Sequence, residues 1–205
     1  MTVFNRRFQK FGITVLSIFI SLFISCTTEI TLTLQKDDSV DIRFAGGAGE
    51  AFAKMTGTSS GLIDAEAVSY ELAKAGFDNV KVSQSGGGVV LISMCDRKQS
   101  SYVFTSGIAK IEKGRIKASI TRKSLEDFYA SADEQTKMIL DLFLAPVFNG
   151  EEMSESEYVE MVASFYGEKA ANEVNETIVK INLISKDGSK ETMKIPLTKL
   201  LCSIQ

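Results

Sequence analysis

Residues 29–44, EITLTLQKDDSVDIRF, constrain the fold of this chain more than any other stretch, because apolar and polar residues alternate in them. The apolar positions are Ile30, Leu32 and Leu34 before a polar turn, and Val40, Ile42 and Phe44 after it. A period of two on both sides of a short turn predicts a β-hairpin with one buried face. Residues 177–197 predict a second hairpin at the other end of the chain, with Asp187-Gly188 in its turn.

Between these hairpins the pattern indicates helices and further strands. Residues 64–77 have helical spacing, with Asp64 suited to cap the first turn and Gly76 suited to end the helix. Residues 79–94 predict another hairpin, and residues 101–121 predict strands. Two longer helices are expected after capping boxes, which are Ser124 with Asp127 and Ser154 with Glu157. The order predicts an α+β fold, with a mainly antiparallel sheet built from hairpins and helices packed on one face.

The first 25 residues have the three parts of a secretory signal. Arg6, Arg7 and Lys10 form a basic flank, residues 13–24 form an uncharged apolar run, and Ser25 is small. The alternative is an uncleaved membrane anchor, but a spanning helix needs about 20 apolar residues. We therefore expect a cleaved signal peptide over residues 1–25 and a single α+β domain over residues 26–205.

The end of this leader, LFISC at residues 22–26, resembles the lipobox of bacterial lipoproteins. Phe23 stands where the commonest pattern has Leu, which is similar to the relaxed lipoboxes of spirochaete lipoproteins. The resemblance implies that the chain is cut before Cys26, and that Cys26 then carries lipid, including palmitate-like acyl chains, on its sulfur and its amino group. Several acyl chains anchor a protein stably. The expected location is a bacterial membrane, on its periplasmic face or at the cell surface.

Two further cysteines, Cys95 and Cys202, remain in the mature part. In an exported protein such a pair can form one disulfide. The alternative is two separate buried thiols, because free cysteine is among the most buried residue types.

Charge and the absence of histidine exclude several classes of function. The chain has 23 basic and 26 acidic side chains, and three of the basic ones belong to the leader. Such an acidic domain is not expected to bind nucleic acid, whose affinity depends on phosphate neutralisation. Without histidine the chain cannot form a Ser-His-Asp triad, a Cys-His pair or a His-ligated zinc site.

Two short motifs resemble ligand loops but have the wrong spacing. In FAGGAGEAF, residues 44–52, Phe52 stands where a dinucleotide fingerprint has its third glycine, so we expect a flexible corner. In DDSVD, residues 37–41, the calcium-loop spacing fails because Ala48 replaces the bidentate glutamate, so we expect a solvated turn. No metal or cofactor is predicted.

The most apolar stretch after the leader is residues 138–148, MILDLFLAPVF, which is too short to span a bilayer. It predicts a buried helix; alternatively it forms an apolar surface that binds a lipid tail or a partner, with contacts from Leu140, Leu142, Phe143 and Leu144.

The predicted function is a non-catalytic binding or structural module of the cell envelope, held at the membrane by its N-terminal lipid. Its expected partners are the membrane and a lipid or envelope protein. The alternative is an envelope enzyme that uses Asp/Glu or Ser/Lys chemistry without histidine. A pair of facing carboxylates would favour the enzyme.

Overall fold

The structure, a computed structural model, describes residues 27–47, 49–51, 64–85, 89–131, 137 and 153–202. The described strands are β1 (Thr27–Leu34), β2 (Val40–Gly46), β3 (Asp78–Gln84), β4 (Val90–Asp96), β5 (Ala109–Glu112), β6 (Arg115–Ala118), β7 (Ile178–Ile184) and β8 (Lys190–Pro196). The described helices are α3 (Ala65–Lys74), α4 (Tyr102–Thr105), α5 (Arg122–Ser131), α7 (Glu155–Tyr166), α8 (Glu168–Glu176) and α9 (Leu197–Cys202).

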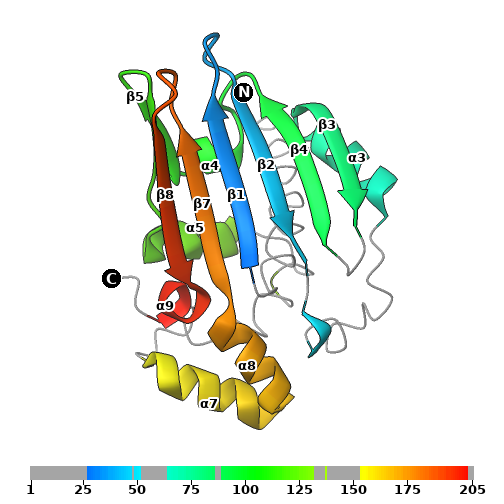
Figure 1. Cartoon of the computed structure of the whole chain (residues 1–205), viewed down its shortest axis with the longest axis vertical. Coiled ribbons are helices and arrows are strands. Elements are labelled where there is room, and N and C mark those ends of the chain that lie inside the picture. The colour runs from blue at the N-terminus through cyan, green and yellow to red at the C-terminus, as the bar shows by residue number, and fades with distance from the viewer. Residues whose placement is uncertain are drawn as a thin grey trace.

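Within this part of the chain the main sheet has six strands in the order β3-β4-β2-β1-β7-β8 (Figure 1). Its three hairpins, β1–β2, β3–β4 and β7–β8, are antiparallel. The two outer hairpins of the sequence meet in the middle of the sheet, where β1 pairs with β7 in parallel. Strands β5 and β6 form a small separate hairpin. The predicted α+β fold with a mainly antiparallel sheet is therefore confirmed, with one parallel pair added.

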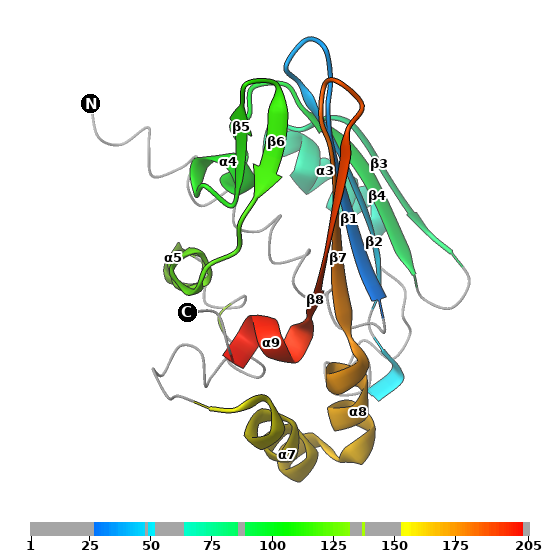
Figure 2. The same cartoon turned by 60° about the vertical axis from the view of Figure 1, so that its left-hand side comes forward.

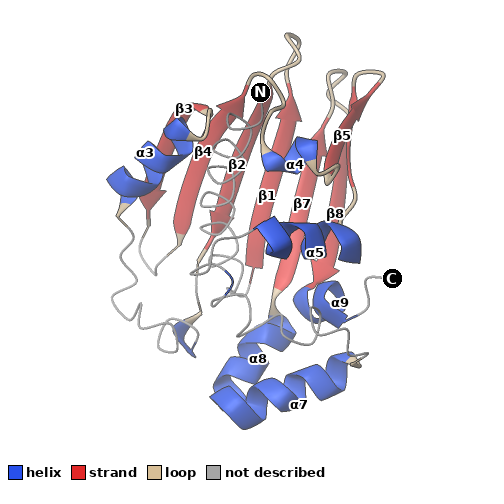
Figure 3. Ribbon diagram, turned by 180° about the vertical axis from the view of Figure 1, so that it is seen from behind, coloured by secondary structure: helices blue, strands red, loops and turns tan. Residues whose placement is uncertain are grey.

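Helices cover only one face of the main sheet. Seen from behind, α3, α4 and α5 lie in front of the strands, and the β5–β6 hairpin lies on the same side (Figures 2 and 3). Helices α7, α8 and α9 gather at the end of the sheet where β7 begins and β8 ends. The opposite face, which Figure 1 shows toward the viewer, is not covered by any described helix.

The alternation in sequence explains this one-sided packing. The apolar residues of β1 and β2 point to the covered face, where Val40, Leu72 and Phe44 are almost fully buried in the largest core cluster. A second cluster joins α7, α8 and α9 around Tyr158 and Val174. Burial of such side chains stabilises the fold by roughly 1.5–3 kcal/mol each relative to exposure.

Two of the predicted helix starts are confirmed and one is wrong. Asp64 accepts a hydrogen bond from the amide of Ala67, and Ser154 with Glu157 forms the expected reciprocal capping box. Helix α5 instead begins three residues earlier than expected. The hydroxyl of Thr121 accepts from the amide of Ser124, so Thr121 takes the capping position and Ser124 lies inside the first turn.

Two other segments differ from their pattern. Residues 101–121 were expected to be strands throughout, yet Tyr102–Thr105 form the short helix α4 before β5. The apolar run after Ser154 forms two helices, because Gly167 has a φ of 87° and separates α7 from α8. Phe165 follows the buried Tyr158 by seven residues and therefore lies near the same face of α7, yet it is 75% exposed in the last turn of this helix.

Candidate functional site

The expected lipidation site, Cys26, and the apolar stretch with Leu140, Leu142, Phe143 and Leu144 lie outside the described residues. The described residues begin at Thr27, which is the first residue of β1 and pairs with Ile178 of β7. The residue that follows Cys26 is therefore already part of the sheet. It lies at the end of the sheet where α8 leads into β7 (Figure 1).

The possible disulfide between Cys95 and Cys202 is not formed, and both residues are free thiols. Successive pairings across β2 and β1 place Cys95 at the level of Ile184, the last residue of β7. Cys202 ends α9, which follows Pro196, the partner of Ile178 at the start of β7. The length of β7, about 20 Å at the rise of a strand, separates these two levels. A disulfide needs Cα atoms within about 7 Å, so the alternative of two separate thiols holds.

Both thiols are held in their neutral form. Burial raises the pKa of Cys95. A hydrogen bond with Ser39 lowers this pKa in part, and the charge of Asp41 raises it further. Burial raises the pKa of Cys202 to about 11, and Glu155 adds to this shift. Since the thiolate is the nucleophile, neither cysteine has the surroundings of a reactive or catalytic thiol.

A disulfide-exchange reagent such as Ellman's reagent should therefore react slowly with Cys202 in the native protein. In a protein with Cys26→Ala and Cys95→Ala at pH 8, a pKa of about 11 instead of the ordinary 9.0 lowers the thiolate fraction, and so the rate, about a hundredfold below that of the urea-unfolded chain. Titration of an unfolded Cys26→Ala protein without reductant should give two thiols, from Cys95 and Cys202. Equal native and unfolded rates would contradict the burial of Cys202.

The glycine-rich corner after β2 contains an anion from the chain itself. The carboxylate of Glu173, on α8, accepts a hydrogen bond of 2.9 Å from the amide of Ala51. A Cβ at Gly49 would collide with this carboxylate, which explains why a glycine stands there. The position where a phosphate-binding loop would hold phosphate is thus taken by Glu173, a contact between residues 122 positions apart that the local pattern did not indicate.

Replacing Gly49→Ala should displace the Glu173 carboxylate and cost about 1 kcal/mol, the usual loss for a helix-start hydrogen bond. Urea unfolding of the single and double mutants measures this. In a Glu173→Ala background the same Gly49→Ala change should be nearly neutral, because the obstacle is gone. Additive costs in the double mutant would show that Gly49 serves another purpose.

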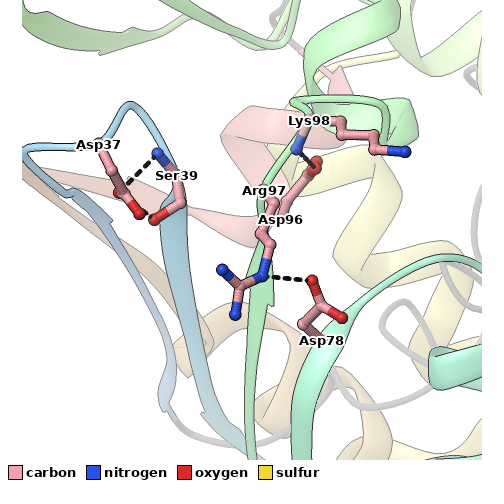
Figure 4. A network of polar contacts seen from close by, with 6 residues as sticks. All are labelled: Asp37, Ser39, Asp78, Asp96, Arg97 and Lys98. Carbon is pink, nitrogen blue, oxygen red and sulfur yellow. Dashed lines mark hydrogen bonds and ion pairs between the residues drawn. The ribbon is translucent and has the colours of Figure 1, made fainter.

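Acidic residues in the β1–β2 and β7–β8 turns, which lie at one end of the sheet, accept hydrogen bonds from serines of the same turns. Asp37 accepts from both the hydroxyl and the amide of Ser39, at 2.6 and 3.1 Å (Figure 4). Asp187 accepts from Ser189 in the same way in the neighbouring hairpin. These hydrogen bonds lower the pKa of both carboxyls. Their contribution to stability is present above the unfolded-state pKa and is lost as pH falls through the folded-state pKa.

The remaining groups in Figure 4 tie loops to strands. Arg97 contacts Asp78 at 2.7 Å across the β3–β4 pair, and Asp96 accepts from the amide of Lys98. Lys186 of the β7–β8 turn reaches Asp38 of the β1–β2 turn at 2.6 Å. Within the described residues no cluster of three potential ligands could hold a metal ion. The turn residues 37–41 therefore have a structural explanation.

The shifted carboxyl groups do not resemble a catalytic acid. Hydrogen bonds from hydroxyls, amides or a lysine lower the pKa of Asp37, Glu112, Glu157 and Asp187. A general acid near neutral pH needs the opposite shift. None of these groups thus provides the acid that the enzyme alternative requires.

The face of the sheet that no described helix covers, called here the open face, carries several charged side chains. Its outward residues include the cations Arg43, Lys81, Lys180, Lys190 and Lys194 and the acids Glu29, Asp41 and Asp78. All three acids have partners, and that of Asp78 is Arg97 at 2.7 Å. Glu29 accepts from Lys180 at 3.1 Å and from Asn182 at 2.6 Å, and Asp41 accepts from Gln35 at 2.7 Å.

The open face is thus basic, although the chain as a whole has a net charge of −3. The sequence pattern did not reveal the basic charge of the open face, because its cations come from β2, β3, β7 and β8. Only the strand order brings them together. Each of these four strands contributes one or two basic residues to the open face, and these residues are not consecutive in the sequence. Alternating outward positions were the only signal that could have revealed the face.

Searches of protein-family models, curated proteins and solved structures find no match to the chain. Among the described helices, none has the length and apolar character needed to cross a membrane.

Proposed function

We propose that this chain is a lipid-anchored module of the bacterial cell envelope, which binds or supports other envelope components without catalysis. The observation that carries the proposal is the sequence LFISC at residues 22–26, after a basic flank and a short apolar run. In this proposal acylated Cys26 is the first residue of the mature protein.

The arrangement of the described residues is compatible with that cleavage. Strand β1 is described from Thr27 onward, and Thr28 and Leu32 of this strand are buried, so the sheet begins directly after the proposed cleavage site. The open face also leaves a broad surface of the sheet available for binding.

Metabolic labelling with palmitate tests the anchor. The native chain should incorporate the label, and a Cys26→Ala variant should incorporate none, because the sulfur that accepts the lipid is absent. Cys202→Ala is the matched control and should be labelled like the native chain, since Cys202 lies in α9 far along the sequence. A native chain without label, or a labelled Cys26→Ala variant, would contradict the proposal.

A further inference from the structure

We propose that the open face of the sheet lies on the anionic headgroups of the bilayer that holds Cys26. This inference rests on the proposed lipid anchor, and it adds an orientation and a preference for negatively charged lipid. It is carried by the position of the anchor, by unpaired cations and by exposed apolar side chains on the same face.

The anchor point leaves no spacer between membrane and sheet. Thr27 follows Cys26 directly and already pairs with Ile178. One residue of extended chain spans at most about 3.6 Å, so the start of β1 must lie at the headgroups once Cys26 is acylated. The molecule then has two simple orientations, upright on the α7–α8 end or flat on the open face.

The cations of the open face favour the flat orientation. Within the described part of the chain, Arg43, Lys81, Lys190 and Lys194 make no ion pair or side-chain hydrogen bond, while Glu29 and Asp41 are both engaged. Each basic residue near an anionic bilayer contributes about 1 kcal/mol of attraction. Lys81, Lys190 and Lys194 lie on the edge strands β3 and β8, where lysines also prevent pairing with other chains, whereas Arg43 lies on the central strand β2.

Apolar side chains on the same face lie near the anchor. Leu91 and Ile178 are 43% and 39% exposed, and both point outward at the end of the sheet where β1 begins. Leu91 lies in the cross-strand row that continues through Glu29 to Lys194. Basic residues next to exposed apolar ones are the composition of surfaces that bind the bilayer interface.

The α7–α8 end opposes the upright orientation. Both helices are rich in exposed acids, namely Glu155, Glu157, Glu160, Glu168 and Glu176, with Lys169 as their basic residue. An upright molecule would press these carboxylates against anionic headgroups. The flat orientation instead places the open face on the lipid, and α7 lies toward the helix-covered side of the sheet (Figure 2).

A tryptophan introduced on each face can report the orientation, because the chain contains none. The full acylated chain carrying Thr33→Trp is reconstituted in vesicles of phosphatidylcholine, alone or mixed equally with phosphatidylglycerol, with brominated acyl chains as quencher. Thr33 lies on the open face at the end of β1 far from Cys26, beside Asp41 and Ile184, so it reaches the lipid only in the flat orientation. Tyr70→Trp is the matched control, since Tyr70 is 65% exposed on α3, at the helix-covered side. We expect quenching of the Thr33→Trp protein in the mixed vesicles, and no quenching of the control.

Charge variants extend the test. In the Thr33→Trp background, Arg43→Gln or Lys194→Gln should each lower the ratio of flat to upright molecules about fivefold, and high salt should lower it further. Lys169→Gln, which removes the same charge from α8, should not lower it. Equal effects of all three variants would show that the net charge of the protein, and not the cations of the open face, determines the ratio of flat to upright molecules.

Flotation of the same samples separates the two proposals. If the protein floats with the vesicles and Thr33→Trp is quenched no more than Tyr70→Trp, the orientation is wrong while the anchor stands. If the protein isolated from cells does not float, the anchor is wrong and the orientation falls with it.

Discussion

Replacing Phe44→Ala should lower the free energy of unfolding by about 3–5 kcal/mol, as expected for a buried Phe that leaves a cavity. Phe44 is 2% exposed and belongs to the central strand β2, where it pairs with Ile30 on one side and Ile92 on the other. Neither neighbour can fill the space, because both are fixed in the ladder. Urea unfolding followed by circular dichroism measures the change.

Leu91→Ala is the matched control for this prediction. Leu91 is on the adjacent strand β4 but on the open face, where it is 43% exposed. The change should alter stability by no more than about 0.5 kcal/mol, as for most surface substitutions. Similar costs for the two substitutions would mean that both faces of the sheet are covered, which contradicts the one-sided fold.

Replacing Asp96→Ala should cost about 2–4 kcal/mol, because hydrogen bonds to a charged group contribute about 1.5–3 kcal/mol and three backbone amides of the loop lose this acceptor. Asp96 is 2% exposed at the end of β4. Its carboxylate accepts from the amides of Lys98, Ser100 and Ser101, at 3.1, 3.1 and 3.0 Å. These contacts hold the loop that leads into α4.

Asp96→Asn separates charge from shape in this loop. The amide keeps one accepting oxygen but places an NH₂ donor against one side of the three amides. We expect a loss between that of Asp96→Ala and zero, seen in the urea midpoint and in faster amide exchange at Ser100 and Ser101. An unchanged midpoint in both variants would show that the loop folds without the carboxylate.

The hairpins were predictable because their signals are local. Alternation on both sides of a short turn predicted β1–β2, and Asp187-Gly188 predicted the β7–β8 turn, where Gly188 has a φ of 78°. Caps are local too, as Asp64 and the Ser154–Glu157 box show. Each depends on residues only a few positions apart.

Long-range contacts were not predictable from a single sequence. The parallel pairing of β1 with β7 joins the two ends of the chain, and no turn residue encodes it. The approach of Glu173 to Gly49 was not predictable either, because it depends on how α8 packs against residues far away in the sequence. Phe165 has core spacing with Tyr158 yet is exposed, because periodicity gives the face of a helix but not how far its cover extends.

The candidate site follows the same division. The leader and Cys26 form a contiguous signal, so the sequence predicts the anchor without any fold. The open face could not be predicted without the strand order, since Arg43 and Lys194 lie on different hairpins. The pairing of β1 with β7 joins these hairpins into one sheet. The sequence left open whether Cys95 and Cys202 form a bridge or two free thiols, because composition counts cysteines without placing them, and the structure has two free thiols.

The most direct test of the central claim is the intact mass and N-terminal sequence of the protein isolated from its native membrane. The account predicts a chain that begins at Cys26, is blocked to N-terminal sequencing and carries the mass of a diacylglycerol and a further acyl group. An unmodified N-terminus at any other residue would contradict the lipid anchor, and with it the membrane-bound orientation of the sheet.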